Sequence, residues 1–531
     1  MSDAVVIGAG PNGLVAANLL ADAGWSVHVL EAEPEPGGAV RSSELTLPGY
    51  THDRFSAFYP LGVASPHIGA LGLEQFGLRW RRAPVAVAHP ARDGSVALLS
   101  DDESETAASL EAFAPGDGEA WHRYMAHFDR YGPRFLRALL SPFPPVRAGG
   151  ALVRELGGRG LLEFARFGML PVRRHAGEAF SGAGAARLMA GNALHADVSP
   201  ETPGGALFAW VLLGLGQRLG WPVPEGGSGR LTDALVARLK AKGGRLTCGA
   251  RVERIQVRRG RAVGVRLEDG RECEARRAVL ADVGAPALYL DLLEREHVPD
   301  HVLRAIERFH YDNATFKVDW ALSRPIPWAA AGVSRAGTVH VTEGVDRLTR
   351  EAADVASGLI PEEPFLICGQ YAPADPTRAP AGAEVAWAYT HVPQHVKGDA
   401  AGEGLTGSWD EGERERFADR MESQVEALAP GFRECIRARY IAAPPQLEAM
   451  DANLKGGALN GGTAQLHQQL VFRPAPGLGR AETPVAGLYL ASASAHPGGG
   501  VHGACGANAA RAALRERGPA ARLMARATRA L

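Results

Sequence analysis

The sequence predicts an α/β fold in which a parallel sheet with alternating helices is joined to an α+β region of helices and a mixed sheet. Three stretches carry this prediction. The first residues alternate strand, glycine-rich turn, helix and strand, residues 105–221 have helical periodicity, and residues 310–395 have the alternation of strands. A chain of 531 residues, 46% of them hydrophobic, is long enough for two or three domains with real cores.

The N-terminal stretch has the spacing of a dinucleotide-binding turn, GxGxxG, followed by a helix predicted over residues 11–23. Gly8 makes the tight turn, Gly10 lets the backbone approach a pyrophosphate, and Gly13 allows close packing of helix and strand. The helix N-terminus faces the negative charge of the phosphates. The residues that we expect to contact the dinucleotide here are Gly8, Gly10, Pro11, Asn12 and Gly13.

A second apolar strand ends at Glu31, eighteen residues after Gly13. A carboxylate in this position can accept hydrogen bonds from the hydroxyls of a ribose. Strand, glycines, helix, strand and terminal acid together favour a Rossmann-type dinucleotide site over a merely glycine-rich turn. Ala32, which follows directly, is assigned to the same site.

A second glycine pair, Gly37 and Gly38, helps to decide whether the dinucleotide is NAD or FAD. With this pair the sequence resembles the phytoene desaturase-like FAD-dependent oxidoreductases, which are related to the flavin amine oxidases and include the pyridine nucleotide-disulphide oxidoreductase domain-containing type. The resemblance implies that FAD is the cofactor, bound noncovalently. It also implies that the second glycine pair supports the pyrophosphate and the ribityl chain.

The resemblance covers nearly the whole chain and assigns further cofactor contacts. Relatives carry Gly-Gly-Arg, whereas here Ala39 and Val40 displace the arginine to Arg41, and both Ala39 and Arg41 are assigned to the site. The strand that holds Val252 is expected to touch the adenine through its backbone. The glycine- and alanine-rich stretch 494–510 is expected to cross beneath the flavin and to begin a helix near residue 501. The residues that it would bring to the flavin are Gly499, Gly500 and Val501.

These segments imply a discontinuous FAD-binding domain formed by residues 1–85, 222–290 and 450–531. The intervening residues, 86–221 and 291–449, are assigned to the substrate domain. No second GxGxxG follows a strand, so we expect no separate NAD(P) domain. Reoxidation of the flavin must then use oxygen, a quinone or another acceptor.

Lys317 is one candidate catalytic residue, in an apolar strand of a chain with only five lysines among its 57 basic residues. Strand alternation places Phe316 and Val318 on one face, and Lys317 and Asp319 on the other. The stretch resembles the amine oxidase strand whose lysine reaches the flavin N5 through a water. Two interpretations stay open: an ammonium that acts at the flavin, or an ion pair with Asp319 at the sheet edge.

His502 is the other catalytic candidate, because it lies in the flavin-facing segment and imidazole titrates near neutral pH. His496 and Cys505 share that segment. All three are also explained as packing or hydrogen-bonding residues beside a cofactor loop. The five cysteines are scattered without a CxxC pair, so we expect no metal site and a reducing compartment, the cytoplasm.

The function implied by the resemblance is oxidation or desaturation of an apolar, polyene or lipid-like substrate, with transfer of a hydride to flavin N5. Three alternatives stay open: amine oxidation, redox-neutral isomerisation that uses reduced flavin, and a non-catalytic interaction protein stabilised by flavin.

Charge and hydropathy exclude other classes of protein. The net charge of −2 gives no attraction to nucleic acid. The longest uncharged stretch, residues 202–217, is shorter than the roughly 20 residues that span a bilayer, so no transmembrane helix is expected. Residues 130–175 carry nine arginines against two glutamates, interleaved with Phe and Leu. This pattern fits either peripheral contact with anionic lipid or the solvated faces of amphipathic helices.

Overall fold

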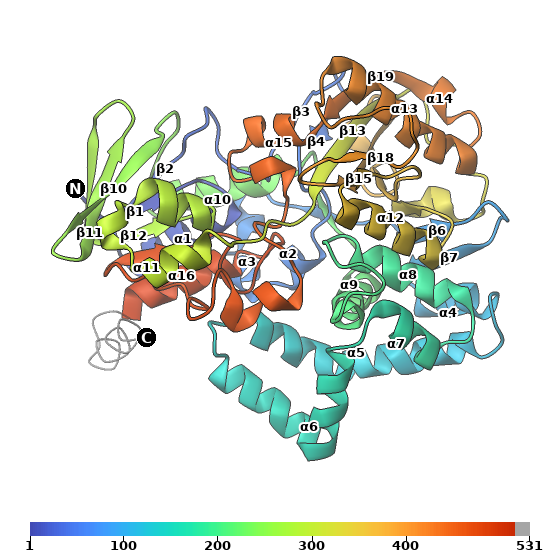
Figure 1. The fold of residues 1–531 in the computed structure, drawn as a ribbon, viewed down its shortest axis with the longest axis horizontal. Coiled ribbons are helices and arrows are strands. Elements are labelled where there is room, and N and C mark those ends of the chain that lie inside the picture. Colours follow the sequence, from blue (N-terminus) through green and yellow to red (C-terminus); the bar gives the residue numbers. More distant parts are fainter. Residues whose placement is uncertain (516–531) are drawn as a thin grey trace.

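The computed structural model describes residues 1–515, which form two seven-stranded sheets and the helices around them (Figure 1). The first sheet lies at the left of Figure 1 with the N-terminus, the second at the upper right, and a block of helices below the second. The α/β fold class with a Rossmann-type unit and a mixed sheet, predicted from the sequence, is therefore confirmed.

The first sheet is the Rossmann-type unit, with the strand order β10-β11-β12-β1-β2-β9 and with β20 added to β12. Strand β1 pairs in parallel with β2 and β12, as repeated strand-helix-strand crossovers require. The strands are β1 (Ser2–Ile7), β2 (Val27–Leu30), β9 (Arg245–Thr247), β10 (Val252–Arg258), β11 (Arg261–Leu267), β12 (Glu272–Ala281) and β20 (Leu488–Leu490).

Helices α1 (Pro11–Asp22), α10 (Gly229–Ala241) and α16 (Ala504–Arg515) pack against the first sheet. A Cβ at Gly506 of α16 would lie 1.9 Å from the backbone oxygen of Asn12 in α1. Only glycine therefore allows the two helices to approach this closely. The contact fixes the C-terminal glycine-rich segment beside the N-terminal glycine turn.

The second sheet is mixed, with the strand order β19-β13-β17-β16-β14-β6-β7. One face packs on helix α13 (Glu411–Leu428) through Phe316, Val318 and Trp320, as the strand alternation predicted. The other face carries Ala321 and Trp387. The strands are β6 (Val85–Pro90), β7 (Val96–Ser100), β13 (Ala314–Leu322), β14 (Ala336–Val341), β16 (Leu366–Gln370), β17 (Glu384–Val392) and β19 (Ile436–Ala442).

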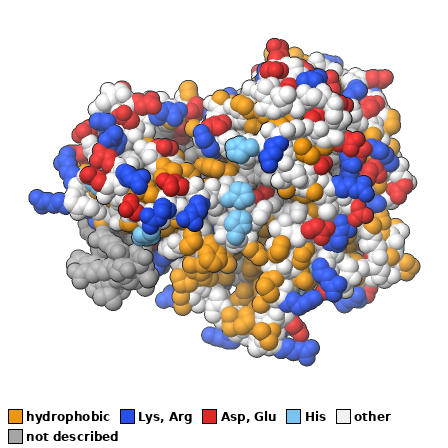
Figure 2. Space-filling model, viewed as in Figure 1, with side chains coloured by type: hydrophobic (Ala, Val, Ile, Leu, Met, Phe, Trp, Pro, Cys, Tyr) orange, Lys and Arg blue, Asp and Glu red, His pale blue; other side chains and the backbone are white. Residues whose placement is uncertain are grey.

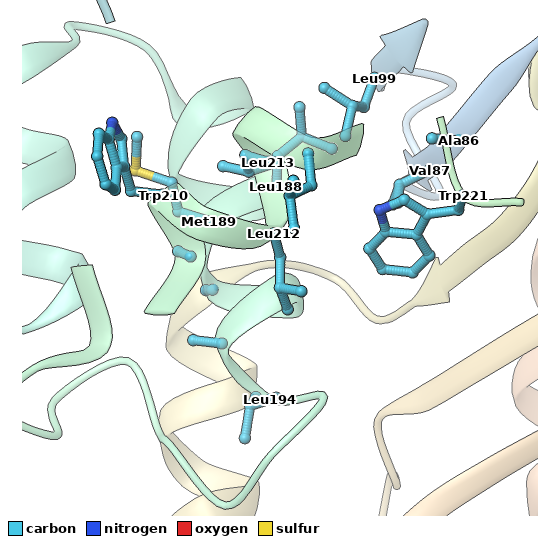
Figure 3. Packing of buried hydrophobic residues seen from close by; sticks show 14 of the residues in the cluster. Ala86, Val87, Leu99, Leu188, Met189, Leu194, Trp210, Leu212, Leu213 and Trp221 are labelled. Carbon is cyan, nitrogen blue, oxygen red and sulfur yellow. The ribbon is translucent and has the colours of Figure 1, made fainter. Parts of the chain in front are cut away.

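The helical block covers this other face of the second sheet. Its apolar helix α9 is buried, and Leu212 and Leu213 of α9 pack with Leu188 of α8 and Leu99 of β7 (Figure 3). Within residues 1–515, no helix is both long and apolar enough to cross a membrane. The helices are α4 (Glu103–Glu111), α5 (Asp117–Leu139), α6 (Val146–Phe167), α7 (Val172–Ala179), α8 (Ala183–Ala193) and α9 (Gly205–Leu219).

Shorter elements connect these units. They are β3 (Ser42–Ser43), β4 (His52–Asp53), α2 (Pro60–Ala64), α3 (Pro66–Gly69), β5 (Trp80–Arg81), β8 (Val223–Pro224), α11 (Asp300–Ile306), α12 (Val345–Ser357), β15 (Leu359–Ile360), β18 (Gly398–Asp399), α14 (Phe432–Cys435) and α15 (Pro444–Met450).

Two points refine the sequence analysis. Helix α16 begins at Ala504 and not near Val501, because Gly503 takes a left-handed conformation with φ +66° and ends the preceding turn. The domain boundaries stay a prediction, and residues 516–531 of the proposed FAD-binding domain lie outside the described residues.

Candidate active site

The N-terminal glycine turn leaves a cradle that side chains would fill. A Cβ at Gly8 or at Gly10 would lie 2.8 Å from an oxygen of Asp282, and one at Gly13 would lie 2.3 Å from the oxygen of Gly8. Gly8 also has φ +91°, which favours glycine. The turn therefore presents bare backbone at the N-terminus of α1, where a pyrophosphate binds in such folds.

Asp282, at the end of β12, is a site residue that the sequence analysis missed. Its Oδ2 accepts a hydrogen bond of 2.7 Å from the backbone N–H of Gly13, in the first turn of α1. Burial raises the pKa of the Asp282 carboxyl to about 7, so this carboxyl is partly neutral near physiological pH. Asp282 reaches the turn because the strand AVLA pairs in parallel with the first strand. This pairing is seen only in the fold.

Glu31 lies at the end of β2 with its carboxylate held by the backbone. Its Oε2 accepts from the N–H of Ala9 at 2.7 Å and its Oε1 accepts from the N–H of Glu33 at 2.9 Å. Each carboxylate oxygen has a second lone pair that a ribose hydroxyl can use. The geometry fits the predicted role of Glu31 as a ribose acceptor.

The second glycine pair lies directly on the first turn. The N–H of Gly37 donates to the oxygen of Ala9 at 2.9 Å, and a Cβ at Gly38 would lie 3.1 Å from the Cα of Gly10. Both glycines have positive φ, +127° and +52°. Ala39, beside them, accepts a hydrogen bond of 2.6 Å from the Ser56 hydroxyl.

Arg41 and Val252 contribute to the walls of this region. The Arg41 side chain is buried and donates to the oxygens of Gly38 at 2.9 Å and Met450 at 2.6 Å. It therefore fixes the second glycine pair, and its contact with the cofactor stays a prediction. The residue two before Val252, Ala250, donates its N–H to the oxygen of Glu31 at 2.8 Å, which places the start of β10 beside the predicted ribose acceptor.

The C-terminal glycines Gly499 and Gly500 belong to the segment that the Gly506–Asn12 contact holds beside the N-terminal glycine turn. Gly499 is half-buried and Gly500 exposed, and a Cβ at Gly499 would lie 2.8 Å from Oδ1 of Asn460. In α1, Oδ1 of Asn12 is buried and has no hydrogen-bond partner among residues 1–515. A backbone cradle, a helix N-terminus, a fixed carboxylate and an unpaired polar atom fit a dinucleotide at this place.

His502 has a structural partner, because its Nδ1 accepts a hydrogen bond of 3.0 Å from the N–H of Ala504 at the start of α16. Burial lowers the pKa of the His502 imidazole to about 4, so the ring is neutral at pH 7. Burial also lowers the pKa of His496 to about 4 and raises the pKa of the Cys505 thiol to about 12. This environment favours packing roles, and catalysis by His502 stays a prediction that the geometry does not strengthen.

Lys317 forms the ion pair that the sequence analysis had left open. Its Nζ donates to Oδ1 of Asp319 at 2.6 Å and to the backbone oxygen of Asp53 at 3.0 Å. The pair does not lie at a sheet edge, because β13 has β17 on one side and β19 on the other. Both side chains are buried. A role of the ammonium at the flavin is compatible with this pair but is not tested by it.

A buried charge network, which no local pattern predicted, lies next to the Lys317–Asp319 pair. Asp53 accepts from both terminal nitrogens of Arg378, at 3.2 Å each, and from the Tyr371 hydroxyl at 2.7 Å. Burial alone would raise the pKa of Asp53, but the Arg378 guanidinium and the hydroxyl donors hold it below its usual value. Arg378 also donates to Asp375 at 2.8 Å. The network joins β4 to the segment after β16.

A group of aromatic rings adjoins this network at Tyr371, whose hydroxyl bonds Asp53. We call Phe58, Trp221, Tyr371, Trp387 and Tyr389 the aromatic wall. Phe58 lies 6.0 Å, between ring centroids, from both Tyr371 and Trp387, and Trp387 lies 6.0 Å from Tyr389. Phe58 and Tyr389 are only half-buried although they come from interior segments. The wall comes from the second sheet, the loop after β4, the segment between α9 and β8 and the residue after β16, so sequence spacing could not reveal it.

Two histidines lie next to the aromatic wall and were also missed. Nε2 of His195, after α8, lies 2.9 Å from Nε2 of His340 on β14, so one ring donates to the other. Burial lowers the pKa of both imidazoles well below the usual value, and both are neutral. His195 packs edge-on against Trp221 at 4.8 Å. Within residues 1–515, side chains with metal-ligand geometry come together elsewhere, at Glu294, Glu296 and His297.

Comparison with known proteins decides the family. The model of the flavin-containing amine oxidoreductases matches residues 12–514 of the 531-residue chain. The chain belongs to this family. It is 30% identical to the mouse (Mus musculus) pyridine nucleotide-disulfide oxidoreductase domain-containing protein 2, over 97% of this chain and 93% of that protein.

Two further comparisons cover nearly all of the chain. Identity to the lycopene-forming phytoene desaturase of Pseudescherichia vulneris is 27%, over 97% of this chain and 99% of the desaturase. Among solved structures, cyclohexylamine oxidase from Brevibacterium oxydans superposes with a TM-score of 0.56 at 19% identity, covering 97% of this chain and 99% of that one. The latter likeness concerns the fold alone.

The resemblance drawn from the sequence, to phytoene desaturase-like relatives of the flavin amine oxidases, is therefore confirmed. This amine oxidoreductase family member is an FAD-dependent oxidoreductase, and its predicted cofactor is also confirmed.

Replacing Glu31 by alanine is expected to weaken FAD retention roughly tenfold or more, since a hydrogen bond to a charged acceptor contributes about 1.5–3 kcal/mol. The Glu31→Gln variant keeps the shape and one acceptor and should lose less. Equilibrium dialysis, with absorbance of the retained flavin, measures the effect. Equal FAD affinity in Glu31→Ala and the unaltered protein would show that Glu31 does not hold the ribose.

Proposed function

We propose that this flavoprotein dehydrogenates an apolar substrate of the polyene or lipid-like class, held against the aromatic wall. The glycine turns and Glu31 would hold FAD, which would supply a hydride acceptor at N5 and a link to oxygen, a quinone or another electron acceptor. The protein contributes a dry, rigid surface that excludes water and holds a substrate C–H in line. The aromatic wall supplies that surface.

The observation that carries the choice of an apolar substrate is the pairing of the charges beside the wall. Asp53, which accepts from the Tyr371 hydroxyl, already bonds the buried cation Arg378. Asp319, which lies opposite Trp387 in the register of β13 and β17, already bonds the buried cation Lys317. A cationic amine would have to displace one of these partners, at the cost of leaving a buried cation unpaired. The surface that remains for the substrate is aromatic and aliphatic.

Anaerobic titration of the yellow protein tests the proposal. A polyene or isoprenoid lipid in detergent should bleach the flavin absorbance and yield a product two hydrogens lighter by mass spectrometry. Putrescine and cyclohexylamine, added in parallel, should leave the spectrum unchanged. Bleaching by the amines alone would favour amine oxidation. Conversion without a change of mass, and only after reduction of the flavin, would favour an isomerase.

We also propose membrane contact through residues 130–175. The residues that support this contact are exposed apolar side chains and not the arginines. Six of the nine arginines in this stretch are in ion pairs: Arg130, Arg134, Arg159, Arg166, Arg173 and Arg174. In contrast, Val146 and Leu162 of α6 are 76% and 74% exposed, and Met169 is 60% exposed. Exposed apolar side chains of this number mark an interaction surface.

This apolar surface continues onto a second segment. Gly204 links the two segments. Its N–H donates to the oxygen of Met169, and a Cβ at Gly204 would lie 3.1 Å from the Leu466 side chain. In Figure 2, hydrophobic side chains gather on the lower part of the molecule over α6 and this segment. The exposed residues of the second segment are Leu466, Leu470, Val471 and Phe472. A surface of this kind, flanked by Arg, suits the headgroup region of an anionic membrane.

Cosedimentation with vesicles of anionic phospholipid checks this contact. We expect binding that falls several-fold in a Val146→Glu/Leu162→Glu variant, because two charges would enter the apolar face. Leu290→Glu, at an exposed leucine outside this surface, is the matched control and should bind like the unaltered protein. Absence of the unaltered protein from the vesicle pellet at low salt would end the proposal of membrane contact.

A further inference from the structure

Arg473 is a buried cation whose hydrogen bonds, within residues 1–515, all go to backbone carbonyl groups. Its side chain is 0% exposed. Nε and Nη2 donate to the oxygen of Ala493 at 3.0 and 2.8 Å, and Nη1 donates to the oxygen of Thr463 at 2.9 Å. Nη2 also donates to the oxygens of Asn460 at 2.9 Å and Gly462 at 3.3 Å. Each nitrogen of the guanidinium thus donates to at least one acceptor, and these acceptors are neutral carbonyl groups.

No carboxylate lies within ion-pair distance of Arg473 in the part of the chain that the structure describes. Asp312 and Asp197 are nearby acids, and they accept hydrogen bonds from the same loop, for example from the N–H of Leu459 and of Ala464. Burial raises the pKa of Asp312 to about 6, so this carboxyl is mostly charged at pH 7 and acts on Arg473 from beyond ion-pair distance. Burial also lowers the pKa of Arg473, but a guanidinium stays protonated in proteins. A buried charge without a paired counter-charge is costly, which calls for a reason beyond packing.

The guanidinium lies directly behind the C-terminal glycine turn. A Cβ at Gly498 would lie 3.3 Å from both Cζ and Nε of Arg473. The next residue, Gly499, lies against Asn460, whose oxygen Arg473 binds. Gly499 and Gly500, the half-buried and exposed glycines of this turn, are the residues that the sequence assigns to the flavin. The fixed positive charge therefore stands behind the backbone that the proposed site presents to the cofactor.

We infer that Arg473 is an electrostatic positioning residue that stabilises negative charge on the flavin ring and so favours its reduction by a carbon–hydrogen donor. A fixed charge in a low-dielectric interior acts over several ångströms and needs no direct contact. A carbon–hydrogen donor is weak, so a flavin that accepts electrons readily matches the proposed substrate. The inference rests on the proposed function in one respect, the placement of the flavin beside residues 498–501.

Sulfite is a probe that needs no substrate. Its sulfur lone pair forms a bond to flavin N5, and the electron pair displaced from the ring system is held as negative charge at N1 and C2=O, without oxidant or proton. A positive charge nearby stabilises this adduct, which is followed as loss of flavin absorbance. The dissociation constant for sulfite therefore measures the charge effect on the FAD-loaded protein.

We expect Arg473→Gln to weaken sulfite binding at least roughly tenfold, and the charge-keeping Arg473→Lys to stay within about threefold of the unaltered protein. The control is Arg238→Gln, which removes another buried arginine, bonded to Asp22 in the first sheet's helix layer. This control should lose stability but keep its sulfite affinity. A merely structural role of Arg473 would lower stability in both Arg473 variants without separating their sulfite affinities.

Two outcomes would overturn the inference: equal sulfite affinity in Arg473→Gln and Arg473→Lys, or no adduct in the FAD-loaded unaltered protein. If Arg473→Gln does not fold, the midpoint potential of FAD in the unaltered protein decides, because it should lie above that of free FAD. A potential below that of free FAD would contradict the inference. A yellow protein that fails these tests leaves the proposed function standing, whereas bleaching by sulfite without bleaching by any apolar substrate contradicts only the proposed function.

Discussion

Replacing Arg378 by methionine is expected to destabilise the folded protein by about 3–5 kcal/mol, because the change leaves the Asp53 carboxylate buried without its cation. Arg378 and Asp53 are 1% and 0% exposed and bond through two parallel contacts of 3.2 Å. The change also removes a partner of Asp375. Thermal melting and urea unfolding of the FAD-loaded protein measure the loss.

A surface ion pair is the matched control. Arg81→Met breaks the pair with Glu225, whose two side chains are 51% and 27% exposed, and should change stability far less than Arg378→Met. The folded state lowers the pKa of Asp53, so the network's contribution is fully present above the unfolded pKa and is lost as the pH falls through the lower, folded value. Equal melting temperatures for Arg378→Met and Arg81→Met would contradict the prediction.

Replacing Lys317 by methionine is expected to slow turnover or flavin reoxidation at least roughly tenfold, which corresponds to about 1.4 kcal/mol of transition-state stabilisation. An ammonium beside the flavin can orient a water for proton movement at N5 or for the attack of oxygen. FAD should stay bound, because Lys317 belongs to the second sheet and the glycine cradle to the first. Stopped-flow measurement of the two half-reactions gives the rates.

The buried pair with Asp319 makes a second variant necessary. Among the described residues, Lys317→Met alone leaves the Asp319 carboxylate with only His52 Nδ1, at 3.5 Å, and this variant should also lose stability. Lys317→Met/Asp319→Asn removes both charges and should recover most of that stability. If the ammonium acts at the flavin, the double variant stays slow. Normal rates in both half-reactions of the double variant would leave Lys317 with only its role in the ion pair.

The cofactor turn was predictable because its causes are local. The tight turn at Gly8, the helix that begins at Pro11 and the acid at Glu31 depend on backbone conformation and spacing within one strand-helix-strand unit.

The exposure of the apolar side chains of α6 was not predictable from local sequence. Its arginines suggested a charged face, but one of them, Arg166, has its ion partner on another helix, at Glu178 of α7.

The sequence by itself determined the fold class, the FAD cofactor and the two faces of β13, since hydrophobic periodicity and glycine spacing act over a few residues. Only the tertiary structure decided which buried charges meet. Asp53 and Arg378 are 325 positions apart, Gly13 and Asp282 are 269 apart, and Arg473 has its carbonyl partners in two different loops. A buried charge needs partners within about 4 Å in space, whatever their separation along the chain. That requirement is met only when the two sheets and their loops have come together.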